Sequence, residues 1–286
     1  MSLNPYTGCS FKCLYCYATA YIGLRDSSPK KQFIARLARD LRRYDKRIPI
    51  NIGTSSDPYP PEEAYYGLTR AALKLLVAEN RKVLVTTKGT LYAKRDLDLM
   101  VKGHVAITPT ITTLDPSISL YVEPGAPTPV SRLNALRTAT RAGVPAGVRV
   151  DPIIPYLNDD PYMIEDLIGS IAEAGAVFVV TSTYKARPDS LKRLVSAFGG
   201  LGERIRKLYS EQGVKVNGYI YLRKSLREKL LGPVIDAARR AGMEYAVCRE
   251  GLTGKLWFNA GSCDGTHLIP GPGDRRDEGL RRWLHS

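Results

Sequence analysis

The sequence predicts an α/β fold built on parallel strands, and three observations support this prediction. Short β-branched runs alternate with segments of helix length along most of the 286 residues, an order that implies parallel pairing. Most of the helical segments end near a glycine, as at Gly103, Gly143, Gly175, Gly213 and Gly242, which is the expected signal for a helix C-terminus. No repeat, low-complexity tract or obvious linker interrupts the chain, so we expect one domain.

The individual elements follow from composition and spacing. Runs rich in Val, Ile and Thr predict strands over residues 48–53, 82–87, 104–108, 146–152, 176–181, 216–221 and 245–248. Between them, helices are predicted over residues 29–44, 61–79, 92–102, 129–142, 162–174, 190–212 and 225–241. In the second of these helices, for example, the apolar residues Leu68, Ala71, Ala72, Leu75 and Leu76 recur at helical spacing.

Three cysteines near the N-terminus form the most specific motif, with Cys9, Cys13 and Cys16 spaced as C-x3-C-x2-C. Three thiolates on one loop can hold three irons of a [4Fe–4S] cube, which normally takes four cysteines. The next cysteine is Cys248, so one iron would stay open for a ligand such as S-adenosylmethionine (SAM). The alternative is a zinc knuckle, but zinc sites usually pair two such elements, and the chain holds three histidines in total.

The stretch from Asn4 to Ala18 resembles the radical SAM superfamily, in particular the branch of spore photoproduct lyase and its "DNA repair photolyase"-like relatives. The resemblance continues through residues 54–62, 87–90, 95–98, 111–115, 123–127 and 151–155. It implies a partial (β/α)6 TIM-type barrel of parallel strands. The whole chain, residues 1–286, would be a single radical SAM domain, with a core over about 4–220 and a C-terminal extension over about 221–286. The resemblance also implies a [4Fe–4S] cluster, SAM and an electron donor such as ferredoxin or flavodoxin.

The candidate SAM contacts follow from this resemblance and from the rule that sites in parallel α/β folds lie at the carboxyl ends of strands. Tyr15 is expected against the adenine, and Lys88, which ends a strand, on the SAM carboxylate. Amides and hydroxyls of residues 53–57 are expected to hold the methionine end. The full candidate set is Tyr15, Thr54, Ser55, Ser56, Asp57, Lys88, Thr108, Thr110 and Arg149. The structural alternatives are a packed Tyr15, an ordinary turn at 53–57 and an exposed Lys88.

Two further pairings are expected from spacing. Arg149 and Asp151 alternate within an apolar strand and point to the same side, so a paired charge inside the barrel is expected. Glu123 is a candidate structural partner of Arg132.

Cys248 and Cys263 are the candidate catalytic residues, and three interpretations of them stay open. They are buried or disulfide-paired structural thiols, or ligands of a second metal with His267, or one of them donates a hydrogen atom to a product radical. In spore photoproduct lyase, a cysteine in the segment corresponding to residues 53–57 has this last role. Because this chain has no cysteine there, photoproduct repair as such is doubtful.

The charge balance favours a polyanionic partner. Lys and Arg total 42 against 28 Asp and Glu, a net charge of +14, which favours nucleic acid, although a basic heat-adapted surface is the alternative. Arg36, Arg39 and Arg43 share one helical face that could guide a phosphate backbone. No stretch approaches about 20 apolar residues, so no membrane span is expected, and the absence of a signal sequence favours the cytoplasm.

The predicted function is therefore a radical SAM enzyme that abstracts hydrogen from a substrate, with nucleic acid repair or modification favoured. The alternatives are a radical SAM enzyme acting on a small metabolite or a protein side chain, and a non-catalytic, metal-containing nucleic-acid-binding protein.

Overall fold

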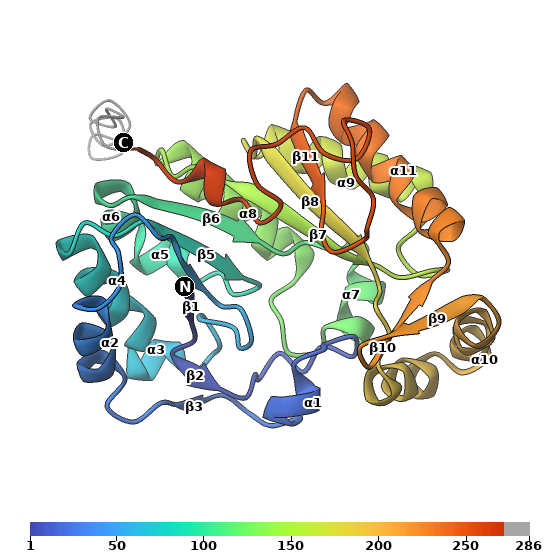
Figure 1. The fold of residues 1–286 in the computed structure, drawn as a ribbon, viewed down its shortest axis with the longest axis horizontal. Helices are drawn as coiled ribbons and strands as arrows, with labels where there is room; N and C mark the ends of the chain where they lie inside the picture. Colours follow the sequence, from blue (N-terminus) through green and yellow to red (C-terminus); the bar gives the residue numbers. More distant parts are fainter. Residues whose placement is uncertain (272–286) are drawn as a thin grey trace.

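A computed structural model describes residues 1–271 of the chain, and its parallel strands form one open row (Figure 1). One sheet has the order β1 (Ser2–Leu3), β4 (Ile50–Ile52), β5 (Val83–Thr87), β6 (Val105–Pro109). A second sheet has the order β11 (Glu244–Val247), β8 (Phe178–Thr183), β7 (Gly147–Ile153). Parallel bridges from Ile107 to Ala146 and from Thr110 to Arg149 join β6 to β7. This arrangement confirms the predicted parallel α/β fold and its partial barrel.

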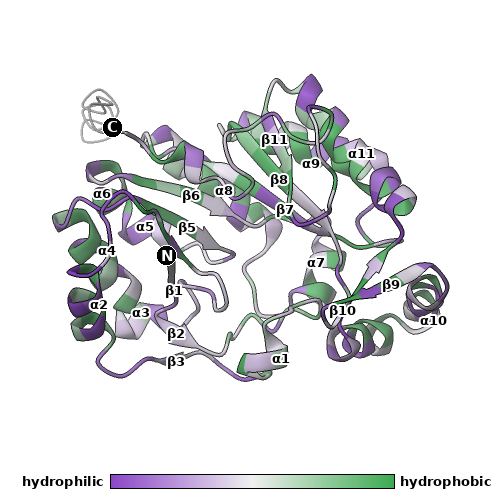
Figure 2. Ribbon diagram, viewed as in Figure 1, coloured by the Kyte–Doolittle hydropathy of each residue, from purple (hydrophilic) through white to green (hydrophobic). Residues whose placement is uncertain are grey.

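Helices pack against the strands through their apolar faces (Figure 2). They include α2 (Phe33–Leu41), α4 (Leu68–Ala78), α6 (Leu97–Lys102), α8 (Pro129–Arg141), α9 (Pro161–Glu173) and α11 (Lys224–Arg240). Leu37, Leu73, Leu136 and Leu167 from these helices share one core with strand residues such as Val85. Burying each such side chain stabilises the fold by roughly 1.5–3 kcal/mol. Within the described residues, no helix is long and apolar enough to cross a membrane.

Capping residues explain where three of the helices begin. Asp115, Thr128 and Asp160 accept hydrogen bonds from the first turns of α7 (Pro116–Val122), α8 and α9, and a proline follows each of them. Helices α8 and α9 match the predicted segments 129–142 and 162–174, whereas α7 was not predicted.

Three predicted helices are interrupted in the structure. The segment 61–79 divides into α3 (Glu63–Tyr66) and α4 at Gly67, whose φ is +59°. The segment 92–102 divides at Asp96 into α5 (Tyr92–Arg95) and α6. Helix α10 (Pro188–Gln212) is kinked at Gly199, where φ is 50°. Glycine adopts positive φ without the steric cost that a side chain brings, so two of the three breaks fall on it.

The strand predicted over residues 216–221 is wrong as a parallel barrel strand. These residues belong to an antiparallel hairpin of β9 (Gly213–Val216) and β10 (Tyr219–Leu222). Asn217 and Gly218 form its turn with φ values of 49° and 79°, the backbone geometry that Asn-Gly favours in tight hairpins. The other short elements, none of them predicted, are β2 (Tyr6–Thr7), α1 (Thr19–Ile22), β3 (Ser28–Pro29) and the 3-10 helix η1 (Thr266–Leu268).

The chain after β11 covers one end of the barrel interior. Ala260 and Leu268 pack against Phe178 at the start of β8, and Ile269 packs against Leu84 and Ala106 in β5 and β6. This segment closes the barrel at the amino ends of the strands and leaves the carboxyl ends open. Residues 272–286, the end of the predicted C-terminal extension, lie outside the described residues.

Candidate functional site

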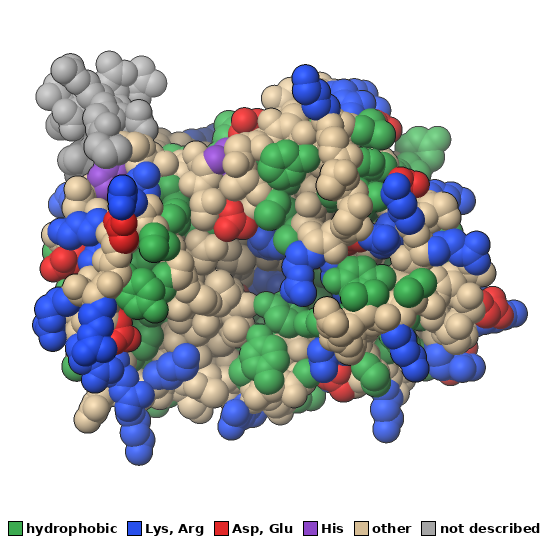
Figure 3. Space-filling view, viewed as in Figure 1, with side chains coloured by type: hydrophobic (Ala, Val, Ile, Leu, Met, Phe, Trp, Pro, Cys, Tyr) green, Lys and Arg blue, Asp and Glu red, His purple; other side chains and the backbone are tan. Residues whose placement is uncertain are grey.

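A pocket of about 390 Å³ opens at the carboxyl ends of the parallel strands. We call it the central pocket. The cysteine loop lines one side of it, together with the loop 53–57 that follows β4. Residues in the strands or just after them line the rest, namely Thr87, Lys88, Thr110, Arg149, Ser182 and Cys248. Figure 3 shows a hollow in the middle of this face, with basic side chains in its depth and at its edge. The volume lies in the range of small-molecule sites.

The loop that carries Cys9, Cys13 and Cys16 is held by close backbone contacts. Leu14 donates its N–H to Val122 at 2.9 Å, and Gly125 donates its N–H to Phe11 at 3.1 Å. A Cβ at Gly125 would stand 2.2 Å from the Ser10 carbonyl oxygen, so only glycine fits at this position. The contacts with the end of α7 explain why residues 123–127 accompany the cysteine motif in the sequence.

All three cysteines line the central pocket as free thiols. Burial, with Asp57 as a second cause, raises the pKa of Cys9 to about 11, and burial raises that of Cys13 further. Iron would therefore have to displace the protons when it binds. In the part of the chain that the structure describes, no group of three or more metal-ligating side chains fits a single metal ion. In a [4Fe–4S] cube each thiolate binds a different iron, so the three sulfurs can lie farther apart than the ligands of a single zinc ion. The three cysteines therefore fit a cluster better than zinc.

A buried ion pair supports Tyr15. The Tyr15 hydroxyl donates to Glu123, which in turn pairs with Arg132, and both charged side chains are almost fully buried. Burial alone would raise the pKa of Glu123, but Arg132 and Lys88 hold it below its usual value. The predicted pairing of Glu123 with Arg132 is confirmed. Tyr15 lines the central pocket with its ring fixed by this pair, and its expected contact with adenine stays a prediction.

Lys88 directs a free charge into the central pocket. Its ammonium nitrogen lies 5.3 Å from the centre of the Tyr15 ring and makes no hydrogen bond or ion pair within the described residues. Burial works to lower the pKa of Lys88, but Cys13 and Glu123 outweigh it and the pKa is raised. Lys88 is therefore a charged donor that lacks a hydrogen-bonded partner, which is what an anionic group of a ligand requires.

Loop 53–57 is anchored from both sides. The Asn4 side chain accepts from the Ser55 N–H at 2.9 Å and bonds Thr54, while the Asp57 carboxylate accepts from Thr87 and from the Lys88 N–H at 2.7 Å. The carboxylate of Asp57 is thus bound to the end of β5, while the residue also lines the central pocket. Ser56 is 4% exposed, lines the pocket, and its hydroxyl has no partner among the described residues.

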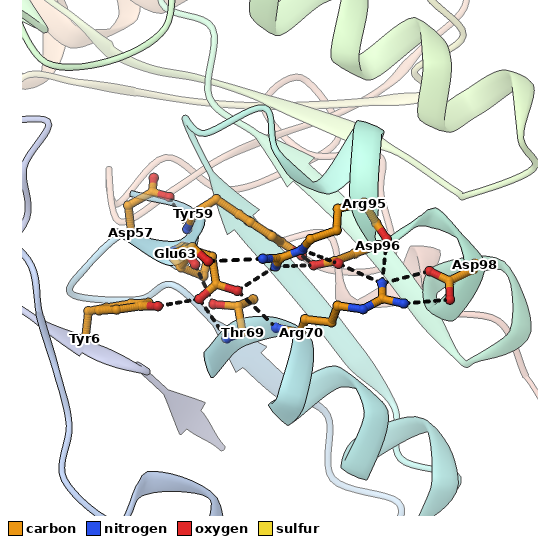
Figure 4. A network of polar contacts seen from close by, with 10 residues as sticks. Tyr6, Asp57, Tyr59, Glu63, Thr69, Arg70, Arg95, Asp96 and Asp98 are labelled. Carbon is orange, nitrogen blue, oxygen red and sulfur yellow. Dashed lines mark hydrogen bonds and ion pairs between the residues drawn. The ribbon is translucent and has the colours of Figure 1, made fainter. Parts of the chain in front are cut away.

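A second buried network connects the loops on this side to the helices (Figure 4). Glu63 accepts from the Tyr6 hydroxyl and pairs with Arg95 at 2.5 Å. Arg95 also pairs with Asp96 at 2.8 Å, and Asp96 accepts from the Tyr59 hydroxyl at 2.9 Å. This network explains the motif at residues 95–98, which holds loop 57–63 in place rather than contacting the central pocket.

The far side of the central pocket carries a second set of polar groups. Arg149 pairs with Asp151 at 2.7 Å, as predicted, and Asp151 also accepts from the Ser182 hydroxyl. The guanidinium of Arg149 interacts with the thiol of Cys248, which lines the pocket just after β11. Cys248 thus lies near Arg149 and Asp151 and lines the same pocket as the three loop cysteines, from which it is far removed in the sequence.

Two predicted site residues need correction. Thr108 is fully buried, because Gly265 covers it and Thr86 bonds its hydroxyl at 2.9 Å, and it does not line the central pocket as Thr110 does. Cys263 is exposed and does not line the pocket either. A second metal site with His267 gains no support, because no group of three or more ligating side chains is found among the described residues, and both ring nitrogens of His267 are hydrogen-bonded, to Ser262 and Glu244.

Sequence reasoning missed the base of the central pocket. Asn51 and Asp264 meet there, with the Asn51 amide nitrogen 3.1 Å from the Asp264 carboxylate. A polar Asn51 between two buried isoleucines was a signal that this strand faces a polar interior. No local pattern could have identified Asp264 as its partner.

The chain belongs to the radical SAM superfamily, whose family model matches residues 3–183. It is 32% identical over 260 residues to the uncharacterized protein Rv2578c of Mycobacterium tuberculosis, an alignment that covers 84% of this chain and 75% of that protein. It is also 28% identical over 166 residues to the uncharacterized protein MJ0683 of Methanocaldococcus jannaschii, covering 57% and 63% of the two chains.

Solved structures show the same fold. A spore photoproduct lyase complexed with dinucleoside spore photoproduct superposes with a TM-score of 0.65 at 17% identity, covering 85% of this chain and 74% of the other. SuiB of Streptococcus suis bound to S-adenosylmethionine superposes with a TM-score of 0.59 at 16% identity, covering 87% and 50%. At such low identity the likeness concerns the fold alone.

Membership of the superfamily makes the protein an enzyme that uses a [4Fe–4S] cluster and SAM, and the central pocket fits both. Cys9, Cys13 and Cys16 would hold the cluster. Within residues 1–271 the ammonium of Lys88 and the hydroxyl of Ser56 have no hydrogen-bond partner, and these two groups would bond SAM. When bound and reduced, this pair of cofactors supplies a 5′-deoxyadenosyl radical that abstracts hydrogen. The protein would hold these donors in the central pocket, which opens at the carboxyl ends of the strands.

We expect the Lys88→Ala variant to bind SAM roughly ten- to a hundredfold more weakly while keeping its iron. The variant loses a charged hydrogen bond in a partly dry site, worth about 2–3 kcal/mol. Equilibrium binding of SAM to the reconstituted protein, with iron content measured in parallel, checks this. Normal SAM affinity combined with weaker binding of nucleic acid would assign Lys88 to the substrate instead.

Proposed function

We propose that this radical SAM enzyme acts on nucleic acid, abstracting a hydrogen atom from a nucleotide that enters the central pocket. The observation that supports the substrate most directly is the charge of that pocket. Its lining includes the basic residues Lys12, Lys88, Arg149, Lys185 and Arg249 and the acidic residues Asp57, Asp151 and Asp264. Lys12, Arg149 and Lys185 are paired with Asp26, Asp151 and Glu250, whereas Lys88 and Arg249 have no ion pair among the described residues. These two uncompensated cations suit a phosphate-bearing ligand, in line with the net charge of +14.

The structural neighbours support the same substrate class without fixing it. Spore photoproduct lyase, which shares the fold, has been solved with a dinucleoside lesion, whereas SuiB, which shares it too, has been solved with a precursor peptide. The basic lining of the central pocket favours the first kind of substrate. Because residues 53–57 contain no cysteine, the reaction differs from photoproduct repair in how its product radical is quenched.

Cys248 is the residue we propose for that quenching step. Its thiol lines the central pocket beside Arg149 and offers a weak S–H bond to a substrate radical. The transfer forms a C–H bond and leaves a sulfur radical. One electron and one proton then restore the thiol, the electron coming from the reductant that the cluster also requires. A carrier of the ferredoxin or flavodoxin type in a reducing, cytoplasmic compartment would supply it.

The test is anaerobic turnover with dithionite, SAM and either mixed RNA, mixed DNA or a peptide library. We expect nucleic acid alone to stimulate formation of 5′-deoxyadenosine several-fold, and perdeuterated nucleic acid to transfer deuterium into that product. In D2O, the isolated nucleic acid should gain solvent deuterium with the natural protein and much less with Cys248→Ala, because thiol protons exchange. Equal turnover with and without nucleic acid, and no deuterium transfer, would contradict the proposed substrate.

A further inference from the structure

The hairpin of β9 and β10 places Tyr219 at the edge of the central pocket, with Tyr221 beside it. Tyr219 and Tyr221 lie two residues apart on β10 and so share one face, with ring centres 6.4 Å apart. Two backbone hydrogen bonds between Ala186 and Ile220, of 2.7 and 3.1 Å, fix this strand to the chain that follows β8. The face is therefore held in position, and Tyr219 lines the pocket.

Each tyrosine has two basic neighbours, and the two beside Tyr221 are paired with a carboxylate. Lys185 and Arg227 lie 5.9 and 5.8 Å from the centre of the Tyr221 ring. The buried Glu250 pairs with both of them, at 2.7 Å to Lys185 and 3.2 Å to Arg227. This cluster satisfies much of its own charge inside the protein.

The two basic neighbours of Tyr219 have no such close carboxylate partner among the described residues. The guanidinium carbons of Arg187 and Arg249 lie 4.9 and 5.8 Å from the centre of the Tyr219 ring. Arg249 is exposed, lines the central pocket and has no ion pair among the described residues. Arg187 has one distant carboxylate partner, Asp189 at 3.8 Å, and its buried Nε atom has no hydrogen-bond partner. Two guanidinium groups thus converge on one phenol with little compensating negative charge.

We propose that Arg187, Arg249 and the Tyr219 hydroxyl bind a phosphodiester of a single nucleic-acid strand at the edge of the central pocket. We call these three residues the rim site. Guanidinium groups bind phosphate through paired hydrogen bonds, and phenols both bond phosphates and stack on bases. A phosphate held at the rim site places the adjoining nucleotide at the pocket opening. This inference rests on the proposed function and specifies how that substrate is held.

The test compares two variants that remove the same charge. Arg187→Gln/Arg249→Gln alters the rim site, and Arg36→Gln/Arg43→Gln removes two exposed arginines in and just after α2, which lies at the opposite end of the view in Figure 1 and does not line the central pocket. Binding of a short fluorescent single-stranded oligonucleotide is followed by anisotropy at several salt concentrations. The rim variant should bind roughly tenfold more weakly, with a salt slope smaller by about one for each phosphate that it no longer neutralises. The α2 variant should bind nearly as tightly as the natural protein. The sequence offered Arg36, Arg39 and Arg43 as a face that could guide a phosphate backbone, but none of them lines the central pocket, and the rim site predicts that they add little.

An oligonucleotide with an uncharged methylphosphonate backbone identifies the group that is bound. The natural protein should prefer the charged strand, and the rim variant should lose most of that preference. The single variants Tyr219→Phe and Arg249→Gln should also weaken binding, and Arg249 is an exposed side chain. The result therefore does not depend on replacing Arg187, which lies at the start of α10. Iron content and thermal melting show that each variant is folded.

Equal losses in the rim and α2 variants would overturn the rim site, as would unchanged binding by the rim variant. Competition by inorganic phosphate or a mononucleotide as strong as that by the strand would also overturn the assignment to a phosphodiester. Turnover of the natural protein separates this inference from the proposed function. If the natural protein transfers deuterium from nucleic acid but the rim variant binds the strand as tightly as the natural protein does, the rim site is refuted and the proposed function stands.

Discussion

Replacing Cys13 with alanine is expected to abolish both iron binding and SAM cleavage. Cys13 is the most buried of the three loop cysteines, and its sulfur would be one of the three protein ligands of the cluster. With two thiolates left, the loop cannot hold three irons. Iron analysis, visible absorption after anaerobic reconstitution, and formation of 5′-deoxyadenosine and methionine measure the two losses.

Cys263→Ala is the matched control, because this thiol is exposed and lies outside the central pocket. It should retain full iron content and SAM cleavage. A Cys13→Ala protein that still assembled a cluster would show that another residue serves as ligand. Zinc in place of iron in the natural protein would point to the structural-metal alternative instead.

Replacing Arg132 with methionine is expected to lower the free energy of unfolding by about 3–5 kcal/mol. The substitution leaves Glu123 charged and buried without its partner. It also removes the hydrogen bonds from Arg132 to the Pro127 carbonyl at 2.7 Å and to the Thr110 carbonyl at 3.1 Å. Urea denaturation of the two proteins measures the difference.

The matched control is Arg206→Met, which removes an exposed ion pair to Glu203 on α10 and should change the free energy of unfolding by less than about 1 kcal/mol. The double variant Glu123→Gln/Arg132→Met should recover part of the loss, because no uncompensated charge stays buried. A loss in Arg132→Met no larger than in the control would show that the buried pair contributes little.

The pH dependence of this effect has a definite sign. The folded-state pKa of Glu123 lies below its usual value, so the stability it contributes is present above the unfolded pKa of about 4.3. That contribution is lost as the pH falls through the folded pKa. In Arg132→Met, burial should instead raise the pKa of Glu123, and the deficit relative to the natural protein should shrink as the pH is lowered toward about 5.

Much of the central pocket could be predicted because its residues belong to short local patterns. The three cysteines lie on one loop, Lys88 directly follows a strand, and Arg149 and Asp151 alternate within one. In each case the two-residue alternation of a strand, the end of a strand or a shared loop determines where the side chain points. The same logic placed Thr108 beside Thr110, and it failed because another part of the chain, around Gly265, covers Thr108.

What could not be predicted depends on contacts between distant segments. Asn51 and Asp264 are separated by 213 positions, and no spacing rule links them. The hairpin was missed for a different reason. The residues from Val216 to Tyr221 have the composition of a strand, so one strand was predicted, but in the structure Asn217 and Gly218 form a turn that divides this segment. Helical spacing over residues 61–79 gives no sign that the side chain of Glu63 is fully buried and contacts Arg95.

The segment that closes the base of the barrel has a consequence for how the site is assembled. Asp264 from this segment lines the same pocket as the cysteine loop, although the two lie far apart in the sequence. Without the segment, the amino ends of β5, β6 and β8 would be uncovered and the pocket would lack part of its base. The pocket is therefore complete only when this distant segment has packed against the strands, so we expect cofactor loading to depend on folding of the barrel as a whole rather than of the cysteine loop alone.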